Sequence, residues 1–291
     1  MKRVALIGSK GYIGKHLEWH LRNMGYAVQG YDFFSSKEEG YVRCDVSNRA
    51  EINAIDLDVD YIFMFAGLTG TKLGFEEYKD FMMVNELGLL NLLDAVRKSV
   101  YRPHVVFPST RLVYKGKESA LVEDAEKELK TVYAVNKLAC EHLLYVYSNV
   151  YRIPFTVFRI CVPFGNIFGN DYSFGTIGSF IRQAKDNGHI TLYGDGRYRR
   201  TFTSMGDLCR QIERTLCQNG STNQVFNVGG KVYSLYEAAI IIAQHYNANI
   251  DFIPFPEVDM KIESGSTFFD SKKIESFTGI TEYQDIRLLL K

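Results

Sequence analysis

The chain has 291 residues, of which 46% are hydrophobic and 23% charged, a composition typical of a globular protein that can bury a large core. The formal net charge is +0, which excludes a general electrostatic attraction to nucleic acid or to an anionic membrane surface. No stretch approaches the roughly 18 consecutive apolar residues of a membrane span. We therefore expect neither a nucleic-acid partner nor a membrane anchor.

Three further features of the sequence concern location and metal binding. Met1-Lys2-Arg3 runs directly into the apolar segment Val4–Ile7, which predicts a strand rather than a removable leader. The five cysteines are odd in number and show no CxxC spacing, so we expect free thiols in a reducing cytoplasm. The six histidines have no ligand spacing with a cysteine or carboxylate, so we predict no metal site.

Short apolar, β-branched runs alternate along the chain with segments whose apolar residues recur at helical spacing. The runs predict strands at Val4–Ile7, Ala27–Tyr31, Tyr41–Cys44, Asp60–Phe65, Val105–Phe107, Thr156–Ile160 and Val225–Val228. The segments predict helices at Ile13–Met24, Glu76–Arg97 and Thr131–Val150. This alternation predicts an α/β fold, a Rossmann-type doubly wound parallel sheet that binds ligands at the carboxyl ends of its strands.

The composition changes after about Phe164, where glycine and asparagine become frequent and helical pieces follow at Ser179–Asn187 and Leu235–Tyr246. We predict that residues 1–164 form a dinucleotide-binding domain to which residues 203–230 return. Residues 165–202 and 231–291 are then expected to form a smaller C-terminal α/β lobe that binds the substrate.

A glycine-rich loop follows the first predicted strand with the spacing Gly8-x-x-Gly11-x-x-Gly14, and a helix follows the loop. Glycines at these positions let the chain turn tightly and let a pyrophosphate approach the backbone amides at the helix N-terminus. Asp32 ends the second predicted strand, at roughly the 20-residue offset of the acid that accepts a ribose hydroxyl in NAD sites. Lys10 lies inside the loop, where its ammonium could reach the 2′-phosphate of NADP, so the sequence favours NAD and leaves NADP open.

Residues 133–137 read Tyr-Ala-Val-Asn-Lys, a YxxxK pattern within a predicted helix. Positions four apart share one helix face, and a nearby ammonium is expected to lower the pKa of the phenol from its ordinary value near 10. The pair could then take a proton from a hydroxyl while hydride leaves its carbon. Ser109 or Thr110, at the end of a predicted strand, could hydrogen-bond the reacting oxygen. In a chain with 19 tyrosines, YxxxK alone also fits an ordinary amphipathic helix.

Together these motifs resemble the extended short-chain dehydrogenase/reductases, in particular the NAD-dependent epimerase/dehydratase group that includes the UDP-glucose 4-epimerases. The resemblance extends from the first strand to about Gly230. It also includes Cys44-Asp45-Val46, Phe65-Ala66-Gly67-Leu68, Val84-Asn85-x-x-Gly88, Arg159-x-x-x-Pro163-x-Gly165, Gly194-Asp195-Gly196 with Arg200-Thr201-Phe202, and Asn227-Val228-Gly229.

The resemblance implies a role for each matching residue. The catalytic residues would be Tyr133, Lys137 and Thr110. The cofactor would be bound by Gly8, Gly11, Tyr12, Ile13, Gly14, Asp32, Asp45, Val46, Ala66, Gly67, Asn85 and Lys137. The substrate would contact Thr69, Thr110, Tyr133, Thr176 and Arg200, with Arg200 meeting the diphosphate of a nucleotide sugar. A homodimer would form through the helices predicted at Glu76–Arg97 and Thr131–Val150.

The predicted function is that of an NAD-dependent nucleotide-sugar epimerase, which oxidises a sugar hydroxyl, lets the keto sugar rotate and returns the hydride to the other face. Arg111-Leu112 replaces the Asp-Glu pair of the 4,6-dehydratases and disfavours that reaction. Val162 stands where the family usually places an asparagine, and Glu263-Ser264-Gly265-Ser266 stands where a late arginine is expected. Two alternatives stay open: an NAD(P)H-dependent reductase of an NDP-4-keto-6-deoxy sugar, and a dinucleotide sensor without catalysis.

Overall fold

The computed structural model describes residues 1–168 and 174–290, which divide into two compact units. Unit 1 contains Met1–Val113, Thr131–Arg159 and Leu216–Phe226, and unit 2 contains Tyr114–Lys130, Ile160–Thr215 and Asn227–Lys291. Within the described residues, no helix combines the length and the apolar character needed to cross a membrane.

Unit 1 is built on a seven-stranded sheet with the strand order β10-β6-β5-β4-β1-β2-β3. The strands are β1 (Arg3–Ile7), β2 (Ala27–Asp32), β3 (Tyr41–Arg43), β4 (Tyr61–Met64), β5 (His104–Thr110), β6 (Phe155–Ile160) and β10 (Gln224–Asn227). The β1–β2, β1–β4, β2–β3 and β4–β5 pairs are parallel. All seven predicted strands are present, and the predicted Rossmann-type fold is confirmed.

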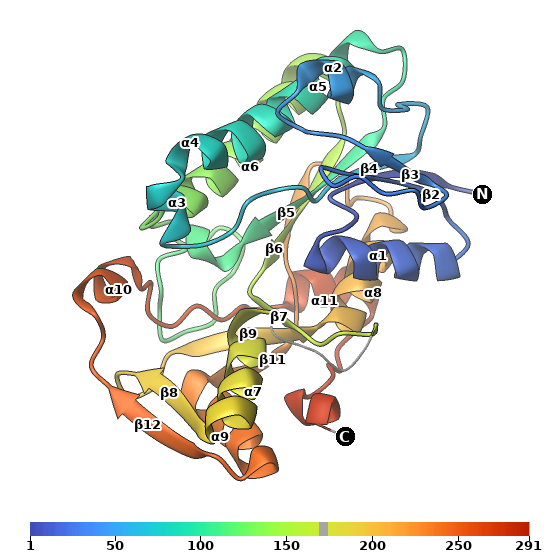
Figure 1. Ribbon diagram of the computed structural model, residues 1–291. Helices are drawn as coiled ribbons and strands as arrows, with labels where there is room; N and C mark the ends of the chain where they lie inside the picture. Colours follow the sequence, from blue (N-terminus) through green and yellow to red (C-terminus); the bar gives the residue numbers. More distant parts are fainter. Residues whose placement is uncertain (169–173, 291) are drawn as a thin grey trace. The chain divides into compact units, whose positions relative to one another are not determined.

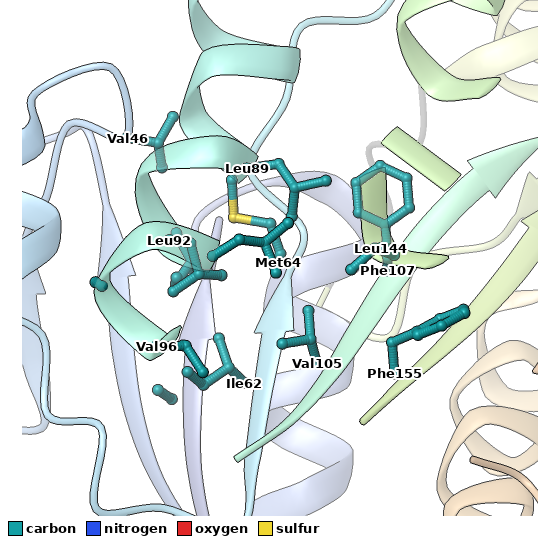
Figure 2. Close-up of a cluster of buried hydrophobic side chains, with 14 of the residues drawn as sticks. Val46, Ile62, Met64, Leu89, Leu92, Val96, Val105, Phe107, Leu144 and Phe155 are labelled. Atoms are coloured by element: carbon teal, nitrogen blue, oxygen red, sulfur yellow. The ribbon is translucent and has the colours of Figure 1, made fainter. Parts of the chain in front are cut away.

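Helices cover both faces of this sheet, with α1 on one face and α2, α5 and α6 on the other (Figure 1). The helical elements of unit 1 are α1 (Tyr12–Asn23), α2 (Arg49–Asn53), α3 (Leu73–Glu76), α4 (Tyr78–Phe81), the π-helix η1 (Met82–Leu87), α5 (Gly88–Lys98), the 3₁₀ turn η2 (Arg111–Val113) and α6 (Val132–Tyr151). Figure 2 shows Leu89, Leu92 and Val96 of α5 directed toward Met64 and Ile62 of β4, and all five are buried. This apolar layer fixes α5 on the sheet.

The helix predicted at Glu76–Arg97 is present as a continuous stretch of α4, η1 and α5 from Tyr78 to Lys98, whereas Glu76 belongs to the separate α3. The break lies at Glu77, whose backbone leaves the helical region with φ −109° and ψ 35°. The π-turn that follows contains Asn85, whose side chain bonds the backbone of Leu68. Insertions of this kind often occur at functional sites. Periodicity does not reveal them, since the apolar spacing continues through the insertion.

Unit 2 contains two smaller sheets, with orders β11-β9-β7 and β12-β8. Its elements are β7 (Val162–Phe164), α7 (Gly175–Asn187), β8 (His189–Tyr193), β9 (Arg199–Ser204), α8 (Met205–Leu216), β11 (Lys231–Ser234), α9 (Leu235–Tyr246), β12 (Asn249–Ile253), α10 (Glu257–Ile262), α11 (Lys272–Thr278) and the 3₁₀ turn η3 (Ile286–Leu290). The predicted α/β character of the C-terminal lobe is therefore present. The apolar core lies between α7, α9 and the strands beside them.

The unit boundaries differ from the predicted domain limits. Residues 203–215 and 227–230, which we assigned to the first domain, belong to unit 2, as do residues 114–130 and 160–164. The physical reason lies in long-range bonds, because β7 pairs with β9 and Asp207 of α8 accepts a hydrogen bond from the Gln284 amide at 2.7 Å. Such partners are far apart in the sequence, so composition alone does not identify them.

A buried ionic network fastens α6 to the sheet of unit 1. Arg159 of β6 donates to both carboxylate oxygens of Glu141 on α6, at 2.9 and 2.5 Å. Ser109 of β5 donates to the same carboxylate at 2.5 Å. The Arg159 and Glu141 side chains are 5% and 3% exposed, so neither charge is solvated by water. The bidentate pairing is what makes the burial of both charges tolerable.

Removing one partner of this network tests its importance. We expect Arg159→Met to lower the free energy of unfolding by about 3–5 kcal/mol, because Glu141 is left buried without its counter-ion. Urea titration followed by circular dichroism measures the change. Lys98→Met is the matched control, since its pair with Asp94 is exposed and is worth less than about 1 kcal/mol. Equal losses in the two variants would show that the buried pair has no special weight.

Candidate active site

Unit 1 contains a cleft of about 560 Å³ at the carboxyl ends of β1, β2 and β4. Among the predicted cofactor residues, it is lined by Gly8, Gly11, Asp32, Asp45, Val46, Ala66 and Gly67. Their meeting follows from the parallel sheet, which brings the ends of neighbouring strands to one edge. Cys44, Phe65, Leu68 and Val84, which belong to the motifs of the family resemblance, also line the cleft. The lining residues that the sequence did not indicate are Phe33, Phe34, Ser47, Glu77 and Asp80.

The glycine loop passes very close to neighbouring backbone. Gly8 has φ +93°, and an added Cβ would lie 2.3 Å from the amide nitrogen of Ala66. A Cβ on Gly14 would lie 1.9 Å from the carbonyl oxygen of Gly8. Helix α1 begins at Tyr12, and its N-cap residue Gly11 provides no capping side chain. The loop is therefore shaped to bring backbone N–H groups to an anionic ligand.

Asp32 and Lys10 are both held in defined positions at this end of the cleft. The Asp32 carboxylate accepts hydrogen bonds from the Lys10 and Phe33 amides, each at 2.8 Å. The Lys10 ammonium pairs with Glu38 and lies 4.8 Å from the centre of the Tyr41 ring. The Lys10 ammonium, which could bind the 2′-phosphate of NADP, is thus already paired with the Glu38 carboxylate.

Asn85 fixes the loop that follows β4. Its side-chain oxygen accepts a hydrogen bond from the Leu68 amide at 2.8 Å, and its side-chain nitrogen donates to the Leu68 carbonyl at 3.1 Å. Asn85 is buried and does not line the cleft itself. It acts by holding Ala66 and Gly67 in place.

Tyr133 and Lys137 lie one turn apart on α6, which begins after the N-cap Thr131. The Lys137 ammonium nitrogen lies 5.8 Å from the centre of the Tyr133 ring and 4.5 Å from that of Phe107 on β5. A Cβ on Gly67 would lie 3.8 Å from the same nitrogen. The predicted pair is therefore adjacent to a residue that lines the dinucleotide cleft.

The structure separates the two hydroxyl candidates on β5. The Ser109 hydroxyl donates to the buried carboxylate of Glu141, so it has a structural task. Thr110 is the last residue of β5, and its hydroxyl oxygen accepts a long hydrogen bond, 3.3 Å, from the Leu112 amide. Thr110 is thus the candidate for contact with a reacting oxygen.

Burial dominates the electrostatics of the pair. It raises the pKa of the Tyr133 phenol above its ordinary value, and the neighbouring Cys140 acts in the same direction. Burial also lowers the pKa of the Lys137 ammonium to about 8, against opposite contributions from Cys140 and Glu141. Our expectation that Lys137 lowers the pKa of the phenol is wrong for this structure. Removal from water disfavours the charged form of each group and is the largest cause of both shifts.

The remaining predicted residues occupy varied positions. Tyr12 and Ile13 are the first, half-buried residues of α1, and Thr69 is exposed in the loop after β4. Thr176 is half-buried in α7 of unit 2. Arg200 of β9 is 2% exposed and forms an ion pair with Glu263, which does not fit an arginine open to a diphosphate.

Glu141 is the main residue that the sequence analysis missed. It follows Lys137 by four positions, so the helical spacing that linked Tyr133 to Lys137 also places Glu141 on the same face. A buried glutamate on that face would have indicated a buried cation as partner. Its identity as Arg159 depends on the packing of β6.

Comparison with known proteins assigns the family. Residues 4–229 match the NAD dependent epimerase/dehydratase family. The chain belongs to this family. It is 26% identical over 233 residues to a probable UDP-glucuronate 4-epimerase of Rhizobium meliloti, covering 73% of this chain and 67% of that protein. It is 27% identical over 266 residues to the dTDP-L-rhamnose 4-epimerase of Burkholderia thailandensis, covering 77% and 70%.

A solved structure of another protein has the same fold. The UDP-glucuronic acid 4-epimerase of Bacillus cereus, in complex with UDP-glucuronic acid and NAD, superposes with a TM-score of 0.82 at 22% identity. The match covers 99% of this chain and 96% of that one. At this identity the likeness shows the fold, which agrees with the predicted family.

The buried Lys137 should destabilise the folded chain in a pH-dependent way. Its pKa falls from 10.5 in the unfolded chain to about 8, which corresponds to about 3 kcal/mol lost when the group is charged. The penalty is complete below pH 8 and disappears above pH 10.5. We therefore expect Lys137→Met to raise the free energy of unfolding by about 3 kcal/mol at pH 7, with a gain less than half as large at pH 9.5.

Urea titrations of the ligand-free protein at the two pH values measure this difference. Lys98→Met, a substitution of an exposed lysine, should change stability little at either pH. A Lys137→Met protein that is less stable than wild type at pH 7 would contradict the expectation.

Proposed function

We propose that the chain is an NAD-dependent epimerase that acts on a nucleotide-linked sugar by transient oxidation of one hydroxyl. The observation that carries this proposal is the Tyr133–Lys137 pair on α6, in which Tyr133 is half-buried and Lys137 is buried beside Gly67 of the dinucleotide cleft. Relatives named UDP-glucuronate 4-epimerase and dTDP-L-rhamnose 4-epimerase support it. In this proposal unit 1 binds the cofactor and unit 2 contributes to substrate binding.

The residues of the cleft fit a dinucleotide. The close approach of Gly8 and Gly14 to backbone, and the uncapped start of α1, suit a pyrophosphate, and Asp32 suits a ribose hydroxyl. The residues that we propose to hold NAD are Gly8, Gly11, Tyr12, Ile13, Gly14, Asp32, Asp45, Val46, Ala66, Gly67 and Lys137, and Asn85 contributes by fixing the backbone at Leu68. Bound NAD⁺ would supply the hydride acceptor and a positive charge beside the phenol.

The residues of the chain then divide the proton chemistry among them. Thr110 orients the sugar hydroxyl, and Tyr133 takes its proton as the carbon is oxidised and returns the proton when the keto group is reduced. Because burial raises the pKa of the phenol, Tyr133 holds its proton in the ligand-free site and must release it to solvent before it can act as the base. Positive charge near the phenol, from Lys137 and from bound NAD⁺, would favour that release. We propose Thr69 and Thr176 as further substrate contacts.

Several observations bear on the alternatives. The pairing of Lys10 with Glu38 favours NAD over NADP and so disfavours an NADPH-dependent reductase. A sensor without catalysis has no use for a Tyr–Lys pair whose burial costs stability. Leu112 cannot transfer a proton, which argues against 4,6-dehydration. The five cysteines are free thiols, and we propose a reducing, cytoplasmic location.

Tyr133→Phe tests the proposed chemistry. We expect turnover of UDP-hexoses or dTDP-hexoses to fall about 10²–10⁴-fold, because the general acid–base group is lost. The dinucleotide released on denaturation should be NAD in both proteins, as identified by mass spectrometry. Tyr145→Phe, in the same helix, is the matched control and should keep its activity. Full activity of Tyr133→Phe, or wild-type protein that neither releases NAD nor converts any sugar, would contradict the proposal.

We also propose a homodimer that forms through α6. The other helix predicted to form the dimer, at Glu76–Arg97, contains Phe81 and Leu92. Both side chains are fully buried inside the chain, so they belong to its own core. By contrast, Val135, Val146 and Val150 of α6 are 45%, 54% and 62% exposed. Their spacing places them along one stripe of the helix. An exposed apolar stripe of this kind suits a partner helix.

Charges on this stripe should separate the subunits. We expect the wild-type chain to sediment at twice its 33.3 kDa, and Val146→Asp/Val150→Asp to sediment as a monomer, because a dimer would bury the new carboxylates. Val100→Asp, which is also exposed but lies outside α6, should leave the dimer intact. A monomeric wild-type protein would overturn this proposal.

A further inference from the structure

Arg200 of β9 is the arginine that the sequence analysis assigned to a substrate diphosphate, yet its guanidinium is directed into unit 2. Its Nη1 donates to the carbonyl oxygens of Arg199 and Gly265, at 2.9 and 2.5 Å. Its Nη2 donates to Oε1 of Glu263 at 2.7 Å. The side chain is 2% exposed. Both terminal nitrogens of the guanidinium therefore donate to oxygens of the chain itself.

Glu263 is held as firmly as its partner. The same Oε1 accepts a hydrogen bond from the Gly265 amide at 2.9 Å, and the backbone carbonyl of Glu263 accepts one from Lys130 at 2.9 Å. The following residues are fastened to β9, since the Thr267 amide donates to the Arg199 carbonyl at 3.0 Å. The carboxylate is therefore a fixed counter-ion, held by its own loop, rather than a surface side chain that moves freely.

A carboxylate at this position has two effects on an anionic ligand. It satisfies the guanidinium that would otherwise bind a phosphate, and its negative charge repels a second anion at short range. The neighbouring arginines of unit 2 also have partners. Arg199 lies 4.7 Å from the centre of the Phe268 ring, and the exposed Arg197 lies 3.5 Å from Asp195.

We infer that Glu263 is a specificity-determining residue, which occupies the anion-binding edge of Arg200 and removes the arginine contact to a substrate diphosphate. The sugar substrate of this chain is then bound mainly through its other groups, with little affinity gained from a diphosphate. The inference rests on the proposed function for its nucleotide-sugar substrate, whereas affinities for UDP and uridine are measured without turnover.

Calorimetry of the full-length protein with UDP and with uridine tests the inference. We expect the wild type to bind UDP less than about tenfold more tightly than uridine, since one well-made charged contact accounts for about that factor. Arg200→Gln/Glu263→Gln should bind UDP within about threefold of the wild type. Glu263→Gln alone should bind UDP at least about fivefold more tightly, with its uridine affinity unchanged, because the guanidinium loses its competing carboxylate. Arg197→Gln is the surface control.

The opposite results would overturn the inference. One such result is a wild-type protein that binds UDP more than about tenfold more tightly than uridine. A second is a loss of UDP affinity of about tenfold or more in the double variant. A third is a Glu263→Gln protein that binds UDP no better than the wild type. Undetectable UDP binding by both wild type and double variant supports it. Melting temperatures check folding, and if Glu263→Gln unfolds, the double variant and the wild-type ratio decide. Loss of sugar conversion alone concerns Tyr133 and leaves these affinities unaffected.

Discussion

The carboxylate of Glu141 connects three elements of unit 1 at one buried point. It accepts hydrogen bonds from Arg159 of β6 and from Ser109 of β5, while its own backbone belongs to α6. A buried charge must keep its partners, so α6 cannot slide along the sheet without losing them. Tyr133 and Lys137, two turns and one turn earlier on α6, are therefore held in register with the strand that ends at Thr110. The geometry of the candidate active site depends on this anchor.

The same site carries a stability penalty that its function explains. Lys137 is buried over the Phe107 ring, and burial lowers its pKa to about 8. An apolar residue would be more favourable there. In the proposed function, Lys137 supplies positive charge to the bound nucleotide and to the Tyr133 phenol. Asn85 has a comparable role, since its buried amide group holds the loop at Leu68 and so shapes the floor of the cleft.

In this member of the epimerase/dehydratase family, two cations near the predicted ligand sites are paired with carboxylates of the same chain. Lys10 pairs with Glu38 at the edge of the dinucleotide cleft, and Arg200 pairs with Glu263 in unit 2. In both cases a carboxylate within the chain occupies a cation that could bind a phosphate group. We propose that the first pairing favours NAD over NADP, and that the second removes the Arg200 contact to a substrate diphosphate. Membership of the family therefore does not transfer each ligand contact to this chain.

Local spacing in the sequence determined the parts of this protein that depend on neighbours along the chain. The strand–glycine loop–helix pattern at Gly8–Gly14 and the helical pair Tyr133 and Lys137 were predicted because backbone geometry fixes which residues share a turn or a face. Tertiary structure alone decided the rest. The Ser109 hydroxyl bonds Glu141, 32 residues away, which leaves Thr110 as the candidate for contact with a reacting oxygen. Arg200 pairs with Glu263, 63 residues away. Burial, and hence the direction of the Tyr133 pKa shift, likewise exists only after folding, because desolvation is a property of the packed site and not of the sequence around it.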